Sequence, residues 1–186
     1  MLACGALVAA SAQTPLETAQ QIARAEAAAL EYLASHALEM GVERGDLSVV
    51  RSDIDGQSLI HVRVRQTFRG VPVFGGEAIV HLRGSGEVLG QTNSLVGKIT
   101  LDTRPRITVE AALERARTEV GCADCVTQKP DLWVLRHEGV DHLTYRVQAR
   151  LGGAGTSPAL PIVFIDAHDG RLVLRYDNLQ TGKRQQ

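Results

Sequence analysis

Hydrophobic and polar residues recur along this chain with two different periods, and each period predicts one kind of element. A helical period runs from Thr14 to about residue 40. Thr14, Pro15 and Glu17 carry the start signals of a capping box, and Gly41 stands where helices commonly end. We therefore predict a helix that covers a sheet through a narrow apolar stripe. The stripe would consist of Leu16, Ala19, Ala23, Ala27, Leu30, Ala34 and Leu38.

From Leu47 to about Ile99 the period changes to two, which is typical of half-buried strands. Ile60, Val62 and Val64 alternate with polar residues, and Asp55-Gly56 is a hairpin turn signal. Paired glycines at 75–76 interrupt the strand predicted over 73–83 and indicate a bulge or a close backbone approach. This pattern predicts an antiparallel meander with one apolar and one solvated face.

The second half of the chain repeats this plan after a plausible joint at Arg104-Pro105. Thr108 is positioned to cap a second helix that ends at Gly121. Three or four antiparallel strands are predicted to follow, with a Gly/Ser/Pro loop over 152–161. The predicted fold class is α+β, with two small modules that each pack one helix on an antiparallel sheet.

Composition argues against several classes of function. Only 4% of the residues are aromatic and the net charge is -1, with acidic and basic residues interspersed. A broad base-stacking surface and a nucleic-acid footprint are therefore not expected. The chain also has no run of about 18 apolar residues, so no transmembrane helix is predicted.

Residues 1–12 are small, apolar and uncharged, and they end in Ala10-Ser11-Ala12. This pattern is typical of the end of a signal peptide and predicts a secreted or periplasmic protein. An apolar tail with no signal function is the alternative.

Cys122 and Cys125 follow the second helix, and in an oxidising compartment we expect them to form a disulfide. A redox or metal-binding pair is the alternative for these two cysteines.

No self-contained active site is predicted. His137 and His142 are five residues apart, whereas the zinc peptidase motif needs two histidines four apart on one helix, and Gly139 between them indicates a hairpin turn. His61 and His81 fall on the polar phase of strands, where solvated side chains are expected. Turn chemistry accounts for Asp166 without a catalytic role, as it does for Asp55 and Asp169.

The segment Gln66-Thr67-Phe68-Arg69-Gly70-Val71-Pro72-Val73-Phe74-Gly75-Gly76 resembles a signature of the propeptides of thermolysin-like and fungalysin-like zinc metallopeptidases, the FTP type. The matching positions are Gln66, Phe68, Gly70, Val71, Pro72, Val73, Gly75 and Gly76. The second half resembles a PepSY domain, which follows in such propeptides. Its closing hairpin matches at Ile165, Asp166, Ala167 and Gly170. The two resemblances divide the chain into an FTP-like domain over 14–102 and a PepSY-like domain over 104–178.

By this resemblance the chain is a pro-region that acts as an intramolecular chaperone and as a temporary inhibitor of a peptidase. Its partner would be a thermolysin-like peptidase domain, in cis or in trans, and zinc would belong to that domain while this chain holds no cofactor. The second module is expected to dock on the enzyme. The polar tail at 179–186 would lead to the pro–mature junction, with Asp177, Asn178 and Leu179 as the junction segment. A free-standing secreted inhibitor or binding module, and a metal or redox protein using the two cysteines, are the alternatives.

Overall fold

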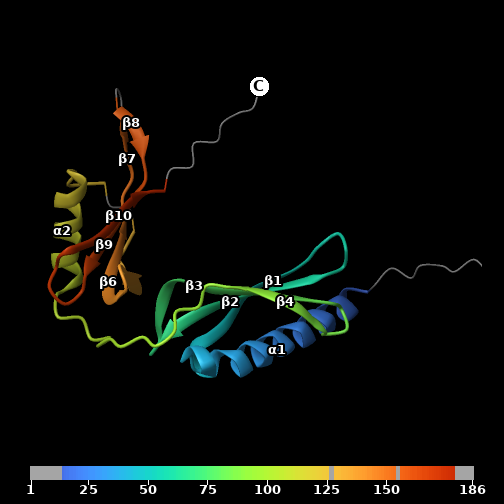
Figure 1. Cartoon of the computed structure of the whole chain (residues 1–186). Coiled ribbons are helices and arrows are strands. Elements are labelled where there is room, and N and C mark those ends of the chain that lie inside the picture. Colours follow the sequence, from blue (N-terminus) through green and yellow to red (C-terminus); the bar gives the residue numbers. More distant parts are fainter. Residues whose placement is uncertain (1–13, 126–127, 154–155, 179–186) are drawn as a thin grey trace, which may run out of the picture.

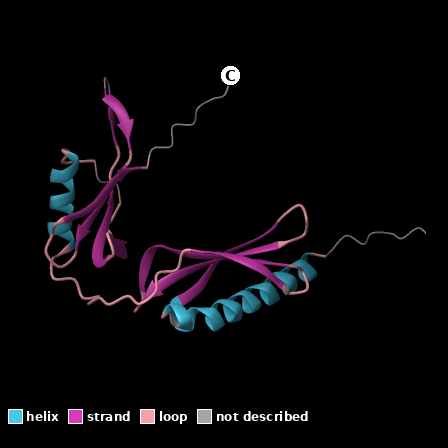
Figure 2. Ribbon diagram, viewed as in Figure 1, coloured by secondary structure: helices cyan, strands magenta, loops and turns pink. Residues whose placement is uncertain are grey.

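The computed structural model describes residues 14–125, 128–153 and 156–178. The predicted leader at 1–12 and the predicted tail at 179–186 lie outside these residues. The described residues form two groups of elements that meet at an angle, with α1 and α2 on the outer side of the bend (Figures 1 and 2). The α+β fold class with helices packed on a mostly antiparallel sheet is therefore confirmed.

The first group, here called the first module, contains one long helix and four strands. Its elements are α1 (Pro15–Met40), η1 (Arg44–Asp46), β1 (Leu47–Ile54), β2 (Ile60–Phe68), β3 (Val71–Leu82) and β4 (Val88–Asn93). The second group, the second module, contains one short helix and six strands. Its elements are α2 (Val109–Val120), β5 (Asp131–His137), β6 (Val140–Gln148), β7 (Leu151–Gly153), β8 (Thr156–Ala159), β9 (Pro161–Asp166) and β10 (Leu172–Asp177).

The start of α1 confirms the predicted capping box. The Thr14 N–H donates to Glu17 Oε2 at 2.9 Å, and the Glu17 N–H donates to Thr14 Oγ1 at 3.3 Å. Most of the predicted apolar stripe was wrong, because Leu16 is 69% exposed and the buried positions are Ala25, Ala29 and Leu33. Of the predicted stripe, Leu30 does pack against the core, and the side chain of Leu38 lies outside what the structure describes. Alanines surround this helix on every side, so their spacing alone does not define which face meets the sheet.

The core of the first module lies between α1 and one face of its sheet. Alternate residues of the central strands point into it, as the period-two pattern predicted, and are fully buried. These residues are Ile60, Val62, Val64, Ala78, Val80 and Leu82. The small side chains of Ala25 and Ala29 allow the helix to approach this sheet closely.

The core of the second module lies between α2 and the strands β6 and β9. Thr108 caps α2 by accepting from the Ala111 N–H at 3.2 Å, and Gly121 ends the helix in the left-handed conformation at φ 70°. Ala112 and Ala116 are the buried residues of the helix. They pack with the buried strand residues Leu143, Tyr145, Val147, Val163, Ile165 and Ala167.

One parallel contact joins the two groups of strands. Val73 of β3 pairs with Val134 of β5, which gives a continuous strand order β1-β2-β3-β5-β6-β9-β10, with β4 also pairing β3. The antiparallel pattern read from the sequence did not predict this contact. The predicted loop over 152–161 was also wrong, since β7 and β8 form a separate antiparallel hairpin there. Among the described helices, none is long and apolar enough to cross a membrane.

Candidate functional site

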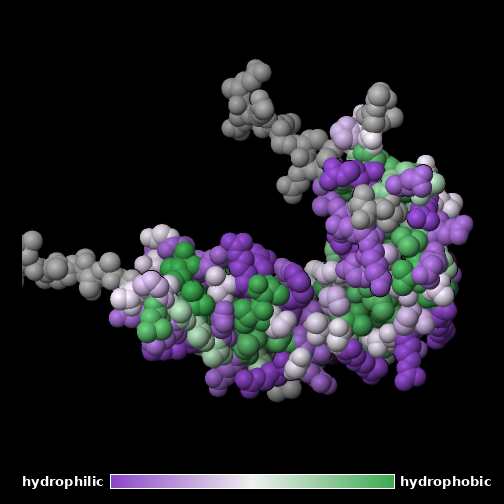
Figure 3. Space-filling model, turned by 180° about the vertical axis from the view of Figure 1, so that it is seen from behind, coloured by the Kyte–Doolittle hydropathy of each residue, from purple (hydrophilic) through white to green (hydrophobic). Residues whose placement is uncertain are grey.

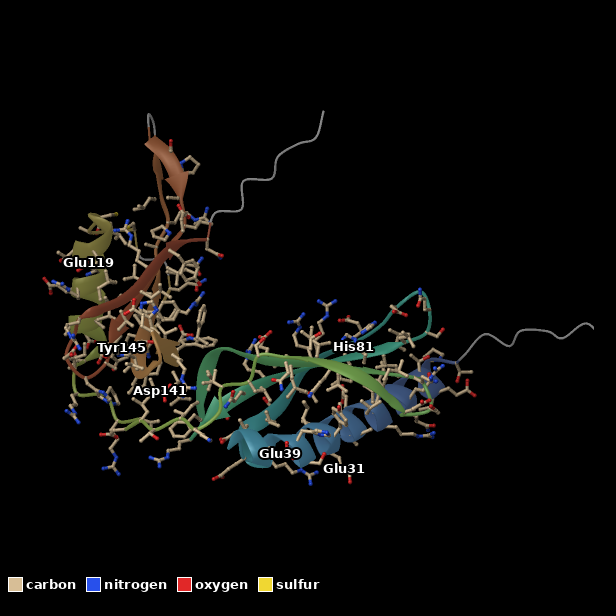
Figure 4. All side chains as sticks on the ribbon, viewed as in Figure 1. Glu31, Glu39, His81, Glu119, Asp141 and Tyr145 are labelled. Atoms are coloured by element: carbon tan, nitrogen blue, oxygen red, sulfur yellow. The ribbon has the colours of Figure 1, made fainter. Side chains whose placement is uncertain are left out.

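The helix-free faces of the two sheets line the inside of the bend (Figure 1). We call this surface the inner face, and it has two parts. The charged half lies on β1, β2 and β3 of the first module and comprises Arg51, His61, Arg63, Arg65, Glu77 and His81. The aromatic half lies on the strands of the second module and on β3, and comprises Phe74, Trp133, Phe164 and Tyr176. Figure 3 shows hydrophilic residues along the upper surface of the first module, and Figure 4 shows His81 on the side of its sheet away from α1.

Ion pairs organise the charged half. Glu77 accepts a hydrogen bond from Arg63 at 2.8 Å and lies 3.5 Å from Arg65, so one carboxylate serves two arginines. Arg51 pairs with Asp53 at 2.7 Å. Pairs this exposed contribute about 0–1 kcal/mol each to stability. The arginines can therefore exchange these carboxylates for those of a partner protein at small cost.

Two histidines meet on the charged half, although the sequence predicted two separate solvated side chains. His61 and His81 are opposite each other in the β2–β3 register, and their Nδ1 atoms are 2.7 Å apart. His61 Nε2 lies 3.0 Å from Asp55 Oδ2. The hydrogen bonds from His61 and from the Leu59 N–H lower the pKa of the Asp55 carboxyl. Only the strand register reveals this pairing, because 20 residues separate the two histidines.

Four of the seven aromatic residues of the chain gather in the aromatic half. The Phe74 ring packs edge-on against Phe164 with centroids 4.8 Å apart, and against Trp133 at 6.1 Å. Tyr176 lies 6.3 Å from both phenylalanines. Phe164 is fully buried beneath the other rings, which are themselves only partly buried. Aromatic side chains such as these partly buried rings are enriched in protein–protein interfaces and among the residues that dominate binding energy.

The segment resembling the propeptide signature forms the turn and bulge between β2 and β3. Arg69 and Gly70 have φ of 50° and 81° and connect Phe68 to Val71, as in a type I′ hairpin. The pairing then slips, because the one residue Gln66 on β2 faces the four residues 73–76 on β3. Pro72 still pairs with Thr67, but Val73 and Phe74 are released from β2.

This bulge explains how the first module reaches the second. Val73 pairs with Val134 of β5, and Phe74 packs into the aromatic half, so both released residues contact the second module. Gly75 adopts a positive φ of 73°, and β3 pairs with β2 again from Glu77 onward. On β2, opposite these unpaired residues of β3, the Gln66 side chain is buried and only 2% exposed.

Gly76 provides the space that this arrangement needs. A Cβ at position 76 would lie 2.9 Å from Gln66 Oε1 and 2.9 Å from Val73 Cβ, closer than real Cβ contacts. We expect Gly76→Ala to lower the free energy of unfolding by about 1–3 kcal/mol, because both neighbours are held in place. Gly90→Ala on β4 is the matched control, since a Cβ there would meet nothing within 4 Å. Urea unfolding measures both, and equal stability of the two variants would contradict the prediction.

The residues matching the PepSY pattern form the end of β9 and the turn to β10. Ile165 belongs to the buried core, and Asp166 accepts from the His168 N–H at 2.8 Å and contacts His142 Nδ1 at 2.9 Å. The Ala167 carbonyl accepts from the N–H groups of Arg106 and Ile107, which fixes the chain before α2. Gly170 has φ 78° in the turn. These positions therefore stabilise the turn after β9 and connect it to the segment before α2 and to β6, and the turn role predicted for Asp166 is part of this.

Cys122 and Cys125 are free thiols in this structure, just after α2. The Cys125 thiol donates to the Cys122 carbonyl oxygen at 3.2 Å. Burial, followed by the hydrogen bond with Cys122, raises the pKa of Cys125 to about 11. A reduced Cys125 is therefore protonated at neutral pH, unlike the activated thiols of redox enzymes. The disulfide between the two cysteines stays a prediction.

The predicted junction segment begins inside the sheet. Asp177 is the last residue of β10 and accepts from the Leu160 N–H at 2.9 Å, while the Asn178 N–H donates to the Leu160 carbonyl at 3.0 Å. Leu179 lies outside the described residues. Within the described residues, no group of three or more His, Cys, Asp or Glu side chains is placed to hold a metal ion.

Comparison with known proteins gives a match over part of the first module. Residues 45–95 match the Fungalysin/Thermolysin Propeptide Motif. A bacillolysin from Brevibacillus brevis is 30% identical over 137 residues, which cover 66% of this chain and 26% of the bacillolysin. A thermolysin from Alicyclobacillus acidocaldarius subsp. acidocaldarius is 28% identical over 155 residues, covering 77% of this chain and 28% of the thermolysin. The chain therefore spans little more than a quarter of these relatives.

A zinc metalloproteinase from Legionella pneumophila is 25% identical over 161 residues, which cover 77% of this chain and 29% of that protein. Among solved structures, the Bacillus megaterium YpeB C-terminal domain has a TM-score of 0.43 and 16% sequence identity, and the match covers 84% of this chain and 64% of that one. Residues 45–95, which include all of Gln66–Gly76, thus match a propeptide motif of the fungalysin/thermolysin type, and similarity to bacillolysin and thermolysin extends beyond them.

Proposed function

We propose that this chain is the pro-region of a secreted or periplasmic thermolysin-like zinc metallopeptidase, assisting the folding of the peptidase domain and covering its active site until cleavage. The match of residues 45–95 to the propeptide motif carries the proposal. The relatives named bacillolysin and thermolysin are much longer than the aligned part, since the chain covers 26% and 28% of them. The remaining length of such proteins accommodates a peptidase domain.

The inner face supports a role in binding a folded protein. It combines half-buried aromatic rings with exposed arginines, and both residue types are enriched where binding energy is concentrated in interfaces. The two halves meet at an angle, so one convex partner could contact both at once (Figure 1). Among the described residues, the helices leave this side of both sheets uncovered.

The chaperone part of the proposal follows from the folding of large secreted enzymes, which are prone to kinetic trapping. A preformed sheet surface can bind the partly folded peptidase domain and stabilise the transition state of its folding. The same surface would then hold the finished domain with its cleft covered. In this scheme the second module acts as a PepSY-like docking domain, and the tail at 179–186 leads to the junction that is cut. Zinc would belong to the peptidase domain.

Inhibition in trans tests the proposal. The purified chain should inhibit a thermolysin-like peptidase from the same source at micromolar concentration, in short assays with a small peptide substrate. Trp133→Ala should weaken inhibition by about tenfold or more, because it removes a partly buried ring that packs on Phe74 in the aromatic half. Leu16→Ala is the control, because Leu16 is exposed on α1 at the outer side of the bend.

Two results would count against the proposal: no inhibition by the unmodified chain at micromolar concentration, or equal loss of inhibition in both variants. A free-standing inhibitor would pass the same assay. The reading frame beyond codon 186 separates the two, because a frame that continues into a His-Glu-x-x-His motif indicates a pro-region.

A further inference from the structure

Both modules hold the short segment that connects them. We call residues 96–100 the linker; they belong to the first part of the connection between the end of β4 at Asn93 and the start of α2 at Val109. At the start of the linker, one buried side chain of the first module forms two hydrogen bonds with the backbone of Val96. Gln66 Nε2 donates to the Val96 carbonyl at 2.8 Å, and Gln66 Oε1 accepts from the Val96 N–H at 2.8 Å. This pair of bonds ties the linker to the bulge between β2 and β3.

The second module forms hydrogen bonds with the same linker through two residues near the tip of its β5–β6 hairpin. Arg136 and Asp141 are opposite each other across this hairpin. Arg136 Nη1 donates to the Gly97 carbonyl at 3.0 Å, and the Thr100 N–H donates to Asp141 Oδ2 at 3.2 Å. Figure 4 shows Asp141 at the end of the second module that faces the linker.

Arg136 and Asp141 also hold each other in a fixed geometry. Arg136 Nε donates to Asp141 Oδ1 at 2.7 Å and Arg136 Nη2 donates to Asp141 Oδ2 at 2.9 Å. Two parallel bonds between a guanidinium and a carboxylate leave little rotational freedom. The Asp141 side chain is only 9% exposed, against 34% for Arg136, so this pair is shielded far better than the ion pairs of the charged half.

The other contacts between the modules are few. The two sheets are connected by one strand pair, Val73 with Val134, and by the insertion of Phe74 into the aromatic half. Val71 of β3 also packs against the core of the second module. Small contacts of this kind usually leave two modules free to move relative to each other. The hydrogen bonds to the linker change this expectation, because Val96 is bonded to the first module while Gly97 and Thr100 are bonded to the second.

We infer that Arg136 and Asp141 are positioning residues. Their hydrogen bonds to Gly97 and Thr100 hold the linker rigid, a role we call the splint, and thereby fix the angle between the charged and aromatic halves of the inner face. The effect of the splint on inhibition rests on the proposed function, whereas its effect on the angle does not. If one partner contacts both halves, loosening the angle adds an ordering cost to binding. The splint would therefore act on affinity without touching the partner.

Residual dipolar couplings of the isotopically labelled full chain test the inference. In the unmodified chain, couplings from both modules should fit one common alignment. In the double variant Arg136→Ala/Asp141→Ala, which leaves no unpaired charge, the two modules should need two different alignments. Arg171→Ala/Asp169→Ala is the matched control, because Arg171 Nε and Asp169 Oδ2 are also 2.7 Å apart but bind no linker group in the described contacts.

Inhibition of the peptidase should weaken by about tenfold in the Arg136/Asp141 variant and stay unchanged in the Arg171/Asp169 variant. The amide spectra report whether each module stays folded, and Asp141→Asn, which conserves shape, provides a second route if the double variant unfolds. A single common alignment in both linker variants, or two alignments in the unmodified chain, would overturn the splint. A loosened angle with unchanged inhibition would overturn the positioning role. Absence of inhibition by the unmodified chain would instead reject the proposed function. The dipolar couplings would still decide whether Arg136 and Asp141 fix the angle.

Discussion

Phe164→Ala should lower the free energy of unfolding by about 3–5 kcal/mol, the range for removing a fully buried phenylalanine ring. The side chain is 0% exposed at the centre of β9, and the rings of Phe74 and Tyr176 rest on it. Its loss would leave a cavity beneath the aromatic half, which the neighbouring strands cannot close because both are paired to β9. Urea unfolding followed by circular dichroism measures the change.

Leu172→Ala is the control for this experiment. Leu172 lies on the adjacent strand β10 but is 37% exposed, so its truncation should cost less than about 1 kcal/mol. A cost below 1 kcal/mol for Phe164→Ala would show that the aromatic half is not packed as described. The prediction therefore tests the base of the inner face independently of any partner.

Gln66→Leu should lower the free energy of unfolding by about 2–4 kcal/mol. Leucine has a similar volume but cannot replace the two 2.8 Å bonds to Val96, so an N–H and a carbonyl lose their partners in a partly buried site. Denaturant unfolding measures the loss. Because the same bonds tie down the linker, the variant should also show increased amide exchange at Val96.

A second glutamine of the same sheet serves as the control. Gln91 on β4 has a buried side-chain oxygen with no hydrogen-bond partner among the described residues. Gln91→Leu should therefore leave stability unchanged or raise it slightly, since it removes a polar atom that gains nothing from burial. A similar loss in both variants would mean that the bonds to Val96 contribute little.

Local signals predicted the elements well. Thr14 and Thr108 mark the two helix starts because a capping side chain bonds to backbone within three residues, and this chemistry is visible in the sequence. The Glu138-Gly139 hairpin turn was predicted for the same reason and is confirmed by φ of 51° and 81°. In each case the interacting groups are neighbours in the chain.

Features that depend on distant residues were missed. The parallel pairing of Val73 with Val134 joins positions 61 residues apart, and nothing in the period-two pattern specifies it. The meeting of His61 with His81 requires the strand register, and the aromatic half requires four segments to converge. The bulge in the propeptide signature was predicted from the paired glycines at 75–76 and is confirmed by the slip in the β2–β3 register. That it sends Phe74 into the second module becomes visible only in three dimensions.

The thin connection between the sheets has a consequence for synthesis on the ribosome. The core of the first module draws only on residues up to Leu95, and Gln66 needs nothing beyond Val96. A nascent chain can therefore complete this core before β5 has left the ribosome. β5 can then pair with the part of β3 at Val73 that β2 leaves unpaired.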